Sequence, residues 1–189
     1  MGPNTKPAFA LWITGLPASG KSTLAAAIAS QVREHGVDVA VLESDELRKI
    51  FTPDPHYGNK ERDTFYRQMA YVGLLLATHG VPVIFDATAN RRAYRDWARQ
   101  QIPKFIEVYV DSPLEVCKVR DPKGIYHDAA TNESNTVPGL ATMYEPPEYP
   151  ELIVHGDREL PVSAAKRVLD VLIEKGYLRG PSTHVCPPR

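Results

Sequence analysis

The sequence has little that would mark a secreted, membrane-bound or strongly charged protein. Only two of its 189 residues are cysteines, Cys117 and Cys186, which is too few for a disulfide framework and gives no spaced metal-ligand pattern. Neither sign of charge prevails, because 22 lysines and arginines face 23 aspartates and glutamates, for a net charge of −1. This balance argues against a nucleic acid as partner, since proteins that bind through bulk charge carry a marked basic excess.

Long hydrophobic runs are also lacking. The apolar stretch around Leu74–Ala77 is far shorter than the roughly 20 residues that span a bilayer. Residues 1–6 (MGPNTK) contain no apolar signal segment. We therefore expect no membrane partner and a reducing, cytoplasmic location, which also suits the scarcity of cysteine. No two histidines lie three or four positions apart, so no zinc site is indicated.

What the sequence does contain is an alternation of short apolar runs and longer helical patterns. Five runs predict buried strands: Ala8–Thr14, Val37–Leu42, Val81–Phe85, Phe105–Val110 and Leu152–His155. The other periodic segments predict helices: Lys21–His35, Asp45–Phe51, Lys60–His79, Asn90–Gln101, Leu114–Arg120 and Val162–Lys175. This alternation favours an α/β fold, a three-layer sandwich in which a five-stranded parallel sheet lies between two layers of helices.

The length of the chain and the absence of a linker predict a single domain over residues 1–189. Residues 1–7 and 180–189 are rich in proline and are expected to form flexible tails. Residues 121–150 interrupt the alternation with five prolines and two glycines. Such an irregular stretch in a compact domain predicts a mobile lid over a functional site.

Gly15–Ser22 (GLPASGKS), hereafter the phosphate loop, is a complete G-x-x-x-x-G-K-[ST] pattern between a predicted strand and a predicted helix. Its glycines allow several backbone N–H groups to point at one phosphate chain, and the helix adds the positive end of its dipole. Lys21 is expected to contact the β- and γ-phosphates, and the Ser22 hydroxyl to ligate Mg²⁺. The predicted ATP-binding residues are Gly15, Pro17, Ala18, Ser19, Gly20, Lys21, Ser22 and Thr23.

The pattern predicts nucleotide binding but leaves the reaction open. A GTPase would carry an N-K-x-D guanine motif after a later strand, and Asn59–Arg62 (NKER) lacks the aspartate. A short chain with a lid fits a small kinase, in which positioning and charge neutralisation accomplish phosphoryl transfer. A nucleotide-binding module without catalysis is the remaining alternative, and the intact Lys21 and Ser22 argue against it.

Three stretches resemble one kinase family: Gly15–Thr23, Phe105–Tyr126 (FIEVYVDSPLEVCKVRDPKGIY) and Tyr144–Pro150 (YEPPEYP). The family is that of the adenylylsulfate kinases, P-loop kinases that phosphorylate the 3′-hydroxyl of adenosine 5′-phosphosulfate (APS) to give PAPS in sulfate assimilation. The resemblance covers about Leu11–Val154. It implies ATP and Mg²⁺ as cofactors and a small anionic molecule as the phosphoryl acceptor.

The resemblance also implies catalytic roles. Asp45 matches the second aspartate of the family's L-D-G-D stretch, which implies that it orients or deprotonates the acceptor hydroxyl, or holds Mg²⁺ through water. The residues alone leave a second interpretation open, in which Asp45 or Ser44 caps the helix that follows. Arg120 opens the family-like lid and is expected to neutralise charge on the transferring phosphoryl group together with Lys21.

Further residues are candidates for contact with the acceptor. Arginine forks bind oxyanions through paired hydrogen bonds, and Arg48, Arg62 and Arg67 match or lie near family arginines. Lys123 lies in the lid, and the rings of Phe51 and Phe65 are candidates for stacking on adenine. Each of these residues also has a structural alternative on a helix face, in a turn or in the core.

Two departures from the family leave the acceptor open. Phe85–Asn90 (FDATAN) stands where the family has F-I-S-P, and it resembles polynucleotide-kinase-like and related small-molecule kinases. Asp86 is therefore a candidate for binding Mg²⁺ through water or an acceptor hydroxyl, or for capping the next helix. The lid also lacks the family's lysines after Tyr126. A kinase for another small anionic or nucleotide hydroxyl acceptor is thus the alternative function, and a homodimer is a candidate assembly because small kinases often pair.

Overall fold

A computed structural model of the protein describes residues 6–131, 136–140 and 142–180. The strands are β1 (Ala10–Thr14), β2 (Ala40–Glu43), β3 (Val83–Asp86), β4 (Phe105–Asp111) and β5 (Leu152–His155). The helices are α1 (Lys21–Glu34), α2 (Ser44–Phe51), α3 (Asn59–Thr78), α4 (Arg92–Gln101), α5 (Leu114–Arg120), α6 (Ile125–Thr131) and α7 (Pro161–Glu174).

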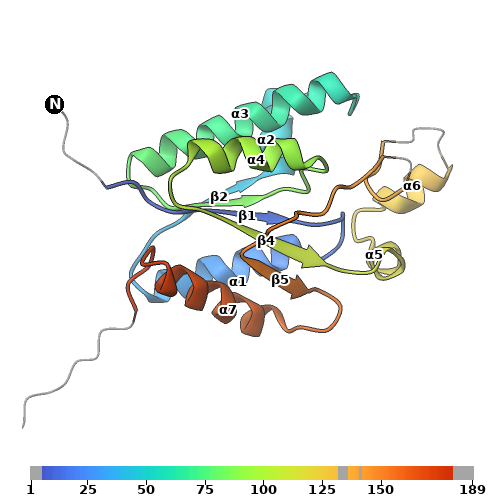
Figure 1. The fold of residues 1–189 in the computed structure, drawn as a ribbon. Coiled ribbons are helices and arrows are strands. Elements are labelled where there is room, and N and C mark those ends of the chain that lie inside the picture. Colours follow the sequence, from blue (N-terminus) through green and yellow to red (C-terminus); the bar gives the residue numbers. More distant parts are fainter. Residues whose placement is uncertain (1–5, 132–135, 141, 181–189) are drawn as a thin grey trace, which may run out of the picture.

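The five strands form one parallel sheet in the order β2-β3-β1-β4-β5. Strand β1 lies at its centre, with Ala10 level with Val83 of β3 and with Phe105 of β4. In Figure 1, α3 and α4 lie on one face of the sheet with α2 beside them, and α1 and α7 lie on the other. The predicted α/β sandwich with a five-stranded parallel sheet is therefore confirmed.

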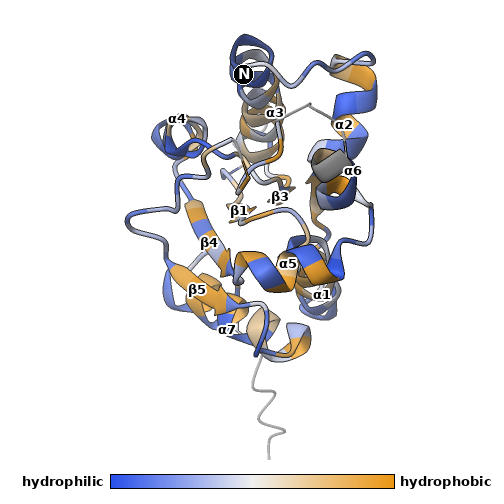
Figure 2. Cartoon of the chain, turned by 90° about the vertical axis from the view of Figure 1, so that its right-hand side faces the viewer, coloured by the Kyte–Doolittle hydropathy of each residue, from blue (hydrophilic) through white to orange (hydrophobic). Residues whose placement is uncertain are grey.

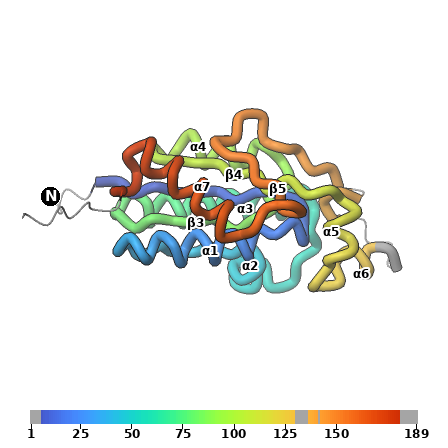
Figure 3. Tube along the Cα trace, turned by 90° about the horizontal axis from the view of Figure 1, so that it is seen from below, coloured from blue at the N-terminus to red at the C-terminus, as the bar shows by residue number. Residues whose placement is uncertain are grey.

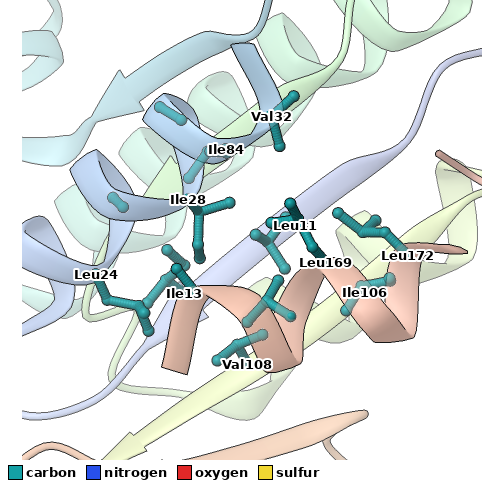
Figure 4. Close-up of a cluster of buried hydrophobic side chains, with 14 of the residues drawn as sticks. Leu11, Ile13, Leu24, Ile28, Val32, Ile84, Ile106, Val108, Leu169 and Leu172 are labelled. Carbon is teal, nitrogen blue, oxygen red and sulfur yellow. The ribbon is translucent and has the colours of Figure 1, made fainter. Parts of the chain in front are cut away.

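The first hydrophobic cluster fills the space between the sheet and the α1–α7 layer. Successive side chains of a strand point to opposite faces, and Leu11 and Ile13 of β1 point to this one. They pack with Ile28 of α1 and Leu169 of α7, as Figure 4 shows. Seen from below in Figure 3, α1 and α7 lie side by side across the sheet.

The second hydrophobic cluster fills the opposite face, beneath α3 and α4. Trp12 of β1 points to this side, and its ring stacks on that of Phe85 with 4.5 Å between centroids. Gly73 allows α3 to approach β3 closely, because a Cβ there would lie 2.0 Å from Cζ of Phe85. Both faces of β1 are thus buried, which explains why its sequence is apolar at every position but the last.

The carboxyl ends of the parallel strands meet at one edge of the sheet. Helices α5 and α6 lie beyond this edge in Figure 1, and they stand in front of the sheet when the molecule is viewed from that end in Figure 2. Open α/β sheets bind ligands at this edge. The fold therefore directs attention to the residues that follow each strand.

The structure corrects several predicted boundaries. The first strand begins at Ala10 rather than Ala8, and α4 begins at Arg92 rather than Asn90. The larger correction is α6, which lies within the stretch expected to be irregular. The carboxylate of Asp121 accepts hydrogen bonds from the backbone N–H groups of Tyr126 (2.8 Å) and His127 (3.0 Å), and so satisfies the start of this helix.

Some predicted features fall partly or wholly outside the described residues, among them residues 132–135 and 141 of the expected lid. The expected tails consist largely of residues 1–5 and 181–189, and Cys186 lies in the second of these ranges. Cys117 is described, and it is a buried, free cysteine. Within the part of the chain that the structure describes, no helix is long and apolar enough to cross a membrane.

Candidate active site

The phosphate loop has the backbone geometry that close approach to an anion requires. Gly15, Ala18 and Gly20 all have positive φ angles, of 153°, 59° and 107°. A Cβ at Gly15 would lie 2.5 Å from the carbonyl oxygen of Val110, so this position has no room for a side chain. Helix α1 has no side-chain N-cap, which leaves its first N–H groups available to an anion.

Lys21, the first residue of α1, is buried and folds back over this loop. Its Nζ donates a hydrogen bond to the carbonyl oxygen of Leu16 at 2.8 Å. Burial lowers the pKa of Lys21, and the carboxylates of Asp86 and Asp45 oppose that shift. A buried ammonium group is stabilised by anionic ligands, and the phosphates of a nucleotide would be suitable ligands at this point.

One cavity of about 850 Å³ lies against the loop, a volume typical of small-molecule sites. One flank comes from α2, α3 and β3, and the other comes from the β5–α7 loop, while the start of the lid reaches across both. The cavity brings together most of the predicted site residues: Pro17, Ala18, Gly20, Lys21, Ser22, Thr23, Asp45, Arg48, Arg62, Asp86, Arg120 and Lys123.

The remaining predicted residues do not line the cavity: Gly15, Ser19, Phe51, Phe65 and Arg67. Gly15 and Ser19 belong to the turn of the phosphate loop. Phe65 is fully buried, because the guanidinium of Arg48 covers its ring at 3.9 Å from the centroid, and no face is left for an adenine. Phe51 packs beside Phe65, and Arg67 is exposed on α3.

Asp45 lies in the first turn of α2, on the α2–α3 flank. No side chain caps this helix, and its N-cap residue is Glu43, so the capping interpretation of Asp45 does not apply. Asp45 instead forms an ion pair with Lys123 of the lid, and the side chains of both are 60% exposed. The hydrogen bond to Asp45 raises the pKa of Lys123. The pair joins the lid to the α2–α3 flank across the mouth of the cavity.

Two buried arginines give this flank positive charge. Arg48 pairs with Glu61 at 3.1 Å, and this contact offsets part of its charge. Arg62 donates from Nε to the carbonyl oxygen of Tyr57 at 2.9 Å and from Nη2 to that of Thr136 at 2.7 Å. Both guanidinium groups therefore hold protein segments in place as well as lining the cavity, and Arg62 ties the middle of the lid segment to α3.

Side chains of β1 and α4 hold the backbone of the loop that follows β3. Three side chains donate to its successive carbonyl oxygens: Trp12 Nε1 to Ala87 (3.2 Å), Thr14 Oγ1 to Thr88 (2.7 Å) and Arg95 Nη1 to Ala89. Ala89 has a φ of +41°, which is rare outside glycine and needs such support. Asp86, at the start of this loop, does not cap α4, whose N-cap is Arg91.

A buried ion network supports this loop and the C-terminal end of the segment predicted to be a lid. Arg95 is 1% exposed, and its Nε pairs with Glu107 at 2.6 Å. Its Nη2 donates to the carbonyl oxygen of Glu145 at 2.7 Å. Arg99 extends the network by pairing with Glu107 at 3.2 Å and with Glu151 at 2.6 Å. Residues 145–151 are thereby fastened to α4 and β4.

The β5–α7 flank contains residues that sequence reasoning missed. A Cβ at Gly156 would lie 2.3 Å from the carbonyl oxygen of Ser19, so this glycine lets the loop rest on the phosphate loop. Arg120 Nη1 donates to the carbonyl oxygen of Gly156 at 2.9 Å. The other lining residues not predicted from sequence include Tyr57, Tyr66, Thr88, Thr136, Val137, Pro138 and residues 157–161. The one available signal was a glycine placed directly after the predicted fifth strand.

The cavity wall fits magnesium and a nucleoside triphosphate. The Ser22 hydroxyl and the carboxylates of Glu43, Asp45 and Asp86 all line it, and hard oxygen ligands suit Mg²⁺. No three histidine, cysteine or acidic side chains among the described residues form a group that could hold a metal alone. These residues therefore suit an Mg²⁺ ion that binds together with the phosphates of the nucleotide and keeps some of its water ligands.

Comparison with known proteins agrees with this geometry. The family model for adenylylsulphate kinase matches residues 7–155. The adenylyl-sulfate kinase of Synechococcus sp. (strain JA-3-3Ab) is 38% identical over 89% of this chain and 96% of its own length. The probable adenylyl-sulfate kinase of Pyrococcus abyssi (strain GE5 / Orsay) is 38% identical over 90% of this chain and 98% of its own length.

A solved structure gives the same result. The Mycobacterium tuberculosis APS kinase, determined in complex with AMPPNP and APS, superimposes with a TM-score of 0.82 and 32% identity. The match covers 88% of this chain and 98% of that one. Sequence, fold and site geometry thus lead to one conclusion: the chain belongs to the adenylylsulphate kinase family.

Proposed function

We propose that this protein is an ATP-dependent kinase that phosphorylates the 3′-hydroxyl of APS to give PAPS and ADP. The observation that carries the proposal is the position of Asp45 across one continuous cavity from the phosphate loop. The choice of APS as the acceptor is supported by the names of the family and of the relatives. The buried Arg48 and Arg62 on the α2–α3 flank suit the anionic groups of such an acceptor.

In this mechanism the phosphate loop holds ATP so that its γ-phosphate faces the α2–α3 flank. The acceptor oxygen attacks the γ-phosphorus, the bond from that phosphorus to the β–γ bridging oxygen breaks, and ADP leaves with the electron pair. Asp45 accepts the proton of the hydroxyl. Lys21 and Arg120 stabilise the charge on the transferring group, and bound Mg²⁺ would neutralise charge on the β- and γ-phosphates.

The lid has the task of excluding water. Lys123 and Arg120 lie at its beginning, and the Arg62 contact to Thr136 holds its middle. When ATP and the acceptor are bound, the phosphates compete for Lys123 and release Asp45 for the hydroxyl. A closed lid then keeps water from accepting the phosphoryl group.

ADP release with Mg-ATP, measured with and without APS, tests the proposal. We expect APS to stimulate release, and Asp45→Ala to lower kcat by about 10²–10⁴-fold with little change in the KM for ATP. Asp96→Ala, at an exposed site on α4, is the matched control. ATP binding without stimulation by APS would contradict the proposal and favour another hydroxyl acceptor, to be found by a screen of nucleotides and sugars.

We also propose that the protein works in the cytoplasm as a homodimer. Tyr71 and Leu75 lie one turn apart on α3 and are 59% and 50% exposed, an apolar pair that a second copy could cover. The free thiol of Cys117 suits a reducing compartment. Sedimentation equilibrium should give twice the chain mass of 21.0 kDa, and the mass of one chain would contradict the dimer.

A further inference from the structure

We propose that Asp86 and Asp45 divide the work of the site, with Asp86 orienting the Mg²⁺ of Mg-ATP beside Ser22 and Asp45 serving the acceptor hydroxyl. This inference rests on the proposed ATP-dependent transfer, but not on the identity of the acceptor. It assigns to Asp86 one of the roles that its sequence context left open.

The first observation is that Asp86 is buried and makes no hydrogen bond or ion pair within the described residues. Its side chain lines the cavity and only 6% of the residue is exposed, yet it forms no hydrogen bond or ion pair with the part of the chain that the structure describes. A buried carboxylate normally has such partners, as Glu107 shows with Arg95 and Arg99. Asp86 therefore presents its carboxylate to the cavity, where only the longer-range charges of Lys21 and Lys123 act on it.

The second observation is the position of Asp86 relative to the phosphate loop. Asp86 ends β3, and in register it is level with Ile13 of β1, the strand that leads into the loop. Of the charged groups around Lys21, Asp86 has the strongest effect in favour of the charged ammonium. Ser22 lines the same cavity. P-loop enzymes hold Mg²⁺ with the loop serine or threonine and an aspartate from a neighbouring strand, which is the arrangement here.

The third observation is that Asp45 is placed for a different task. It follows β2, which is separated from β1 by β3, so it lies one strand farther from the phosphate loop. It is 60% exposed and already paired with Lys123. Its helix also carries Arg48, whose charge faces the proposed acceptor.

Hydrogen bonds also hold the backbone around Asp86 in place, as a metal-orienting carboxylate requires. The next three carbonyl oxygens are held by Trp12, Thr14 and Arg95, and the N–H of Ala87 donates to the carbonyl oxygen of Ile13 at 3.3 Å. A carboxylate on such a support keeps its place when the lid moves. Asp45 lies instead on a short helix linked to that lid.

Binding of AMPPNP, followed by calorimetry at graded Mg²⁺ concentrations and without any acceptor, tests this division. Asp86→Asn should raise the Mg²⁺ concentration for half-maximal AMPPNP affinity about tenfold, as loss of a metal-orienting carboxylate does. Asp45→Asn and the exposed control Asp96→Asn should leave it unchanged.

Turnover separates the two roles further. Raised Mg²⁺ should restore most of the activity of Asp86→Asn but none of that of Asp45→Asn. An unchanged Mg²⁺ midpoint in Asp86→Asn, with a higher KM for the acceptor, would overturn the assignment and place Asp86 on the acceptor. An equal shift in Asp45→Asn would overturn the division. If APS proves not to be the acceptor, the AMPPNP measurement still decides the question, since no acceptor takes part in it.

Discussion

Replacing Arg95 by methionine measures what the buried ion network contributes to stability. The guanidinium is 1% exposed and donates to Glu107 at 2.6 Å, to the carbonyl oxygen of Glu145 at 2.7 Å and to that of Ala89. Methionine fills a similar volume but donates no hydrogen bond. The substitution therefore leaves one buried carboxylate and two carbonyl oxygens without these donors.

The expected loss follows from the partners that remain. Removing one member of a buried ion pair typically costs about 3–5 kcal/mol. Glu107 retains Arg99 at 3.2 Å, so we expect the lower end of that range, about 3 kcal/mol. For a chain of 189 residues each 1 kcal/mol lowers Tm by about 2–4 °C, which predicts a fall of roughly 6–12 °C.

Urea titration and thermal melting of the wild type and Arg95→Met provide the measurement. The double variant Arg95→Met/Glu107→Leu is the informative partner, because it removes both charges and leaves Arg99 paired with Glu151 at 2.6 Å. It should be more stable than the single variant. A loss below about 1 kcal/mol in Arg95→Met, the value of an exposed pair, would refute the reasoning. A double variant less stable than the single one would do the same.

Two further predictions concern the β5–α7 loop and a tyrosine of strand β4. Gly156→Ala puts a Cβ 2.3 Å from the Ser19 carbonyl oxygen and 2.5 Å from Ser112 Oγ, so kcat/KM for ATP should fall on the order of a hundredfold, and unchanged kinetics would contradict this. Burial and the charge of Asp111 raise the pKa of Tyr109 to about 12. Its contribution to stability is full below the usual pKa of about 10 and is lost as pH rises towards 12. The tyrosinate absorbance of the wild type minus Tyr109→Phe should titrate accordingly, and a midpoint near 10 would contradict it.

The sequence was informative about the fold where burial is complete. Ala8–Thr14 predicted a buried strand, because a strand covered on both faces is apolar along its whole length. Helix α6 was missed for the opposite reason, since seven residues in a polar stretch show no readable periodicity. Its start depends on the side chain of Asp121, which the pattern of apolar residues does not report.

The site was predictable where chemistry depends on local backbone or on a residue that ends a strand. The phosphate loop is a contiguous pattern, and Asp45 and Asp86 each follow a predicted strand at the ligand-binding edge. Contacts between residues that are far apart in the sequence could not be predicted from it. Nothing near Arg62 in sequence indicates its bond to Thr136, and nothing near Phe65 indicates that Arg48 covers it. The roles of these residues in catalysis remain predictions until the variants are measured.

Strand β1 supports both hydrophobic clusters and the phosphate loop at once. Leu11 and Ile13 belong to the core on one side of the sheet and Trp12 to the core on the other, and the same strand runs directly into the phosphate loop. Neither helical layer can therefore melt by itself without disturbing the support of the other. We expect the amides of β1 to exchange with solvent only through global unfolding, so that loss of nucleotide binding reports unfolding of the whole chain.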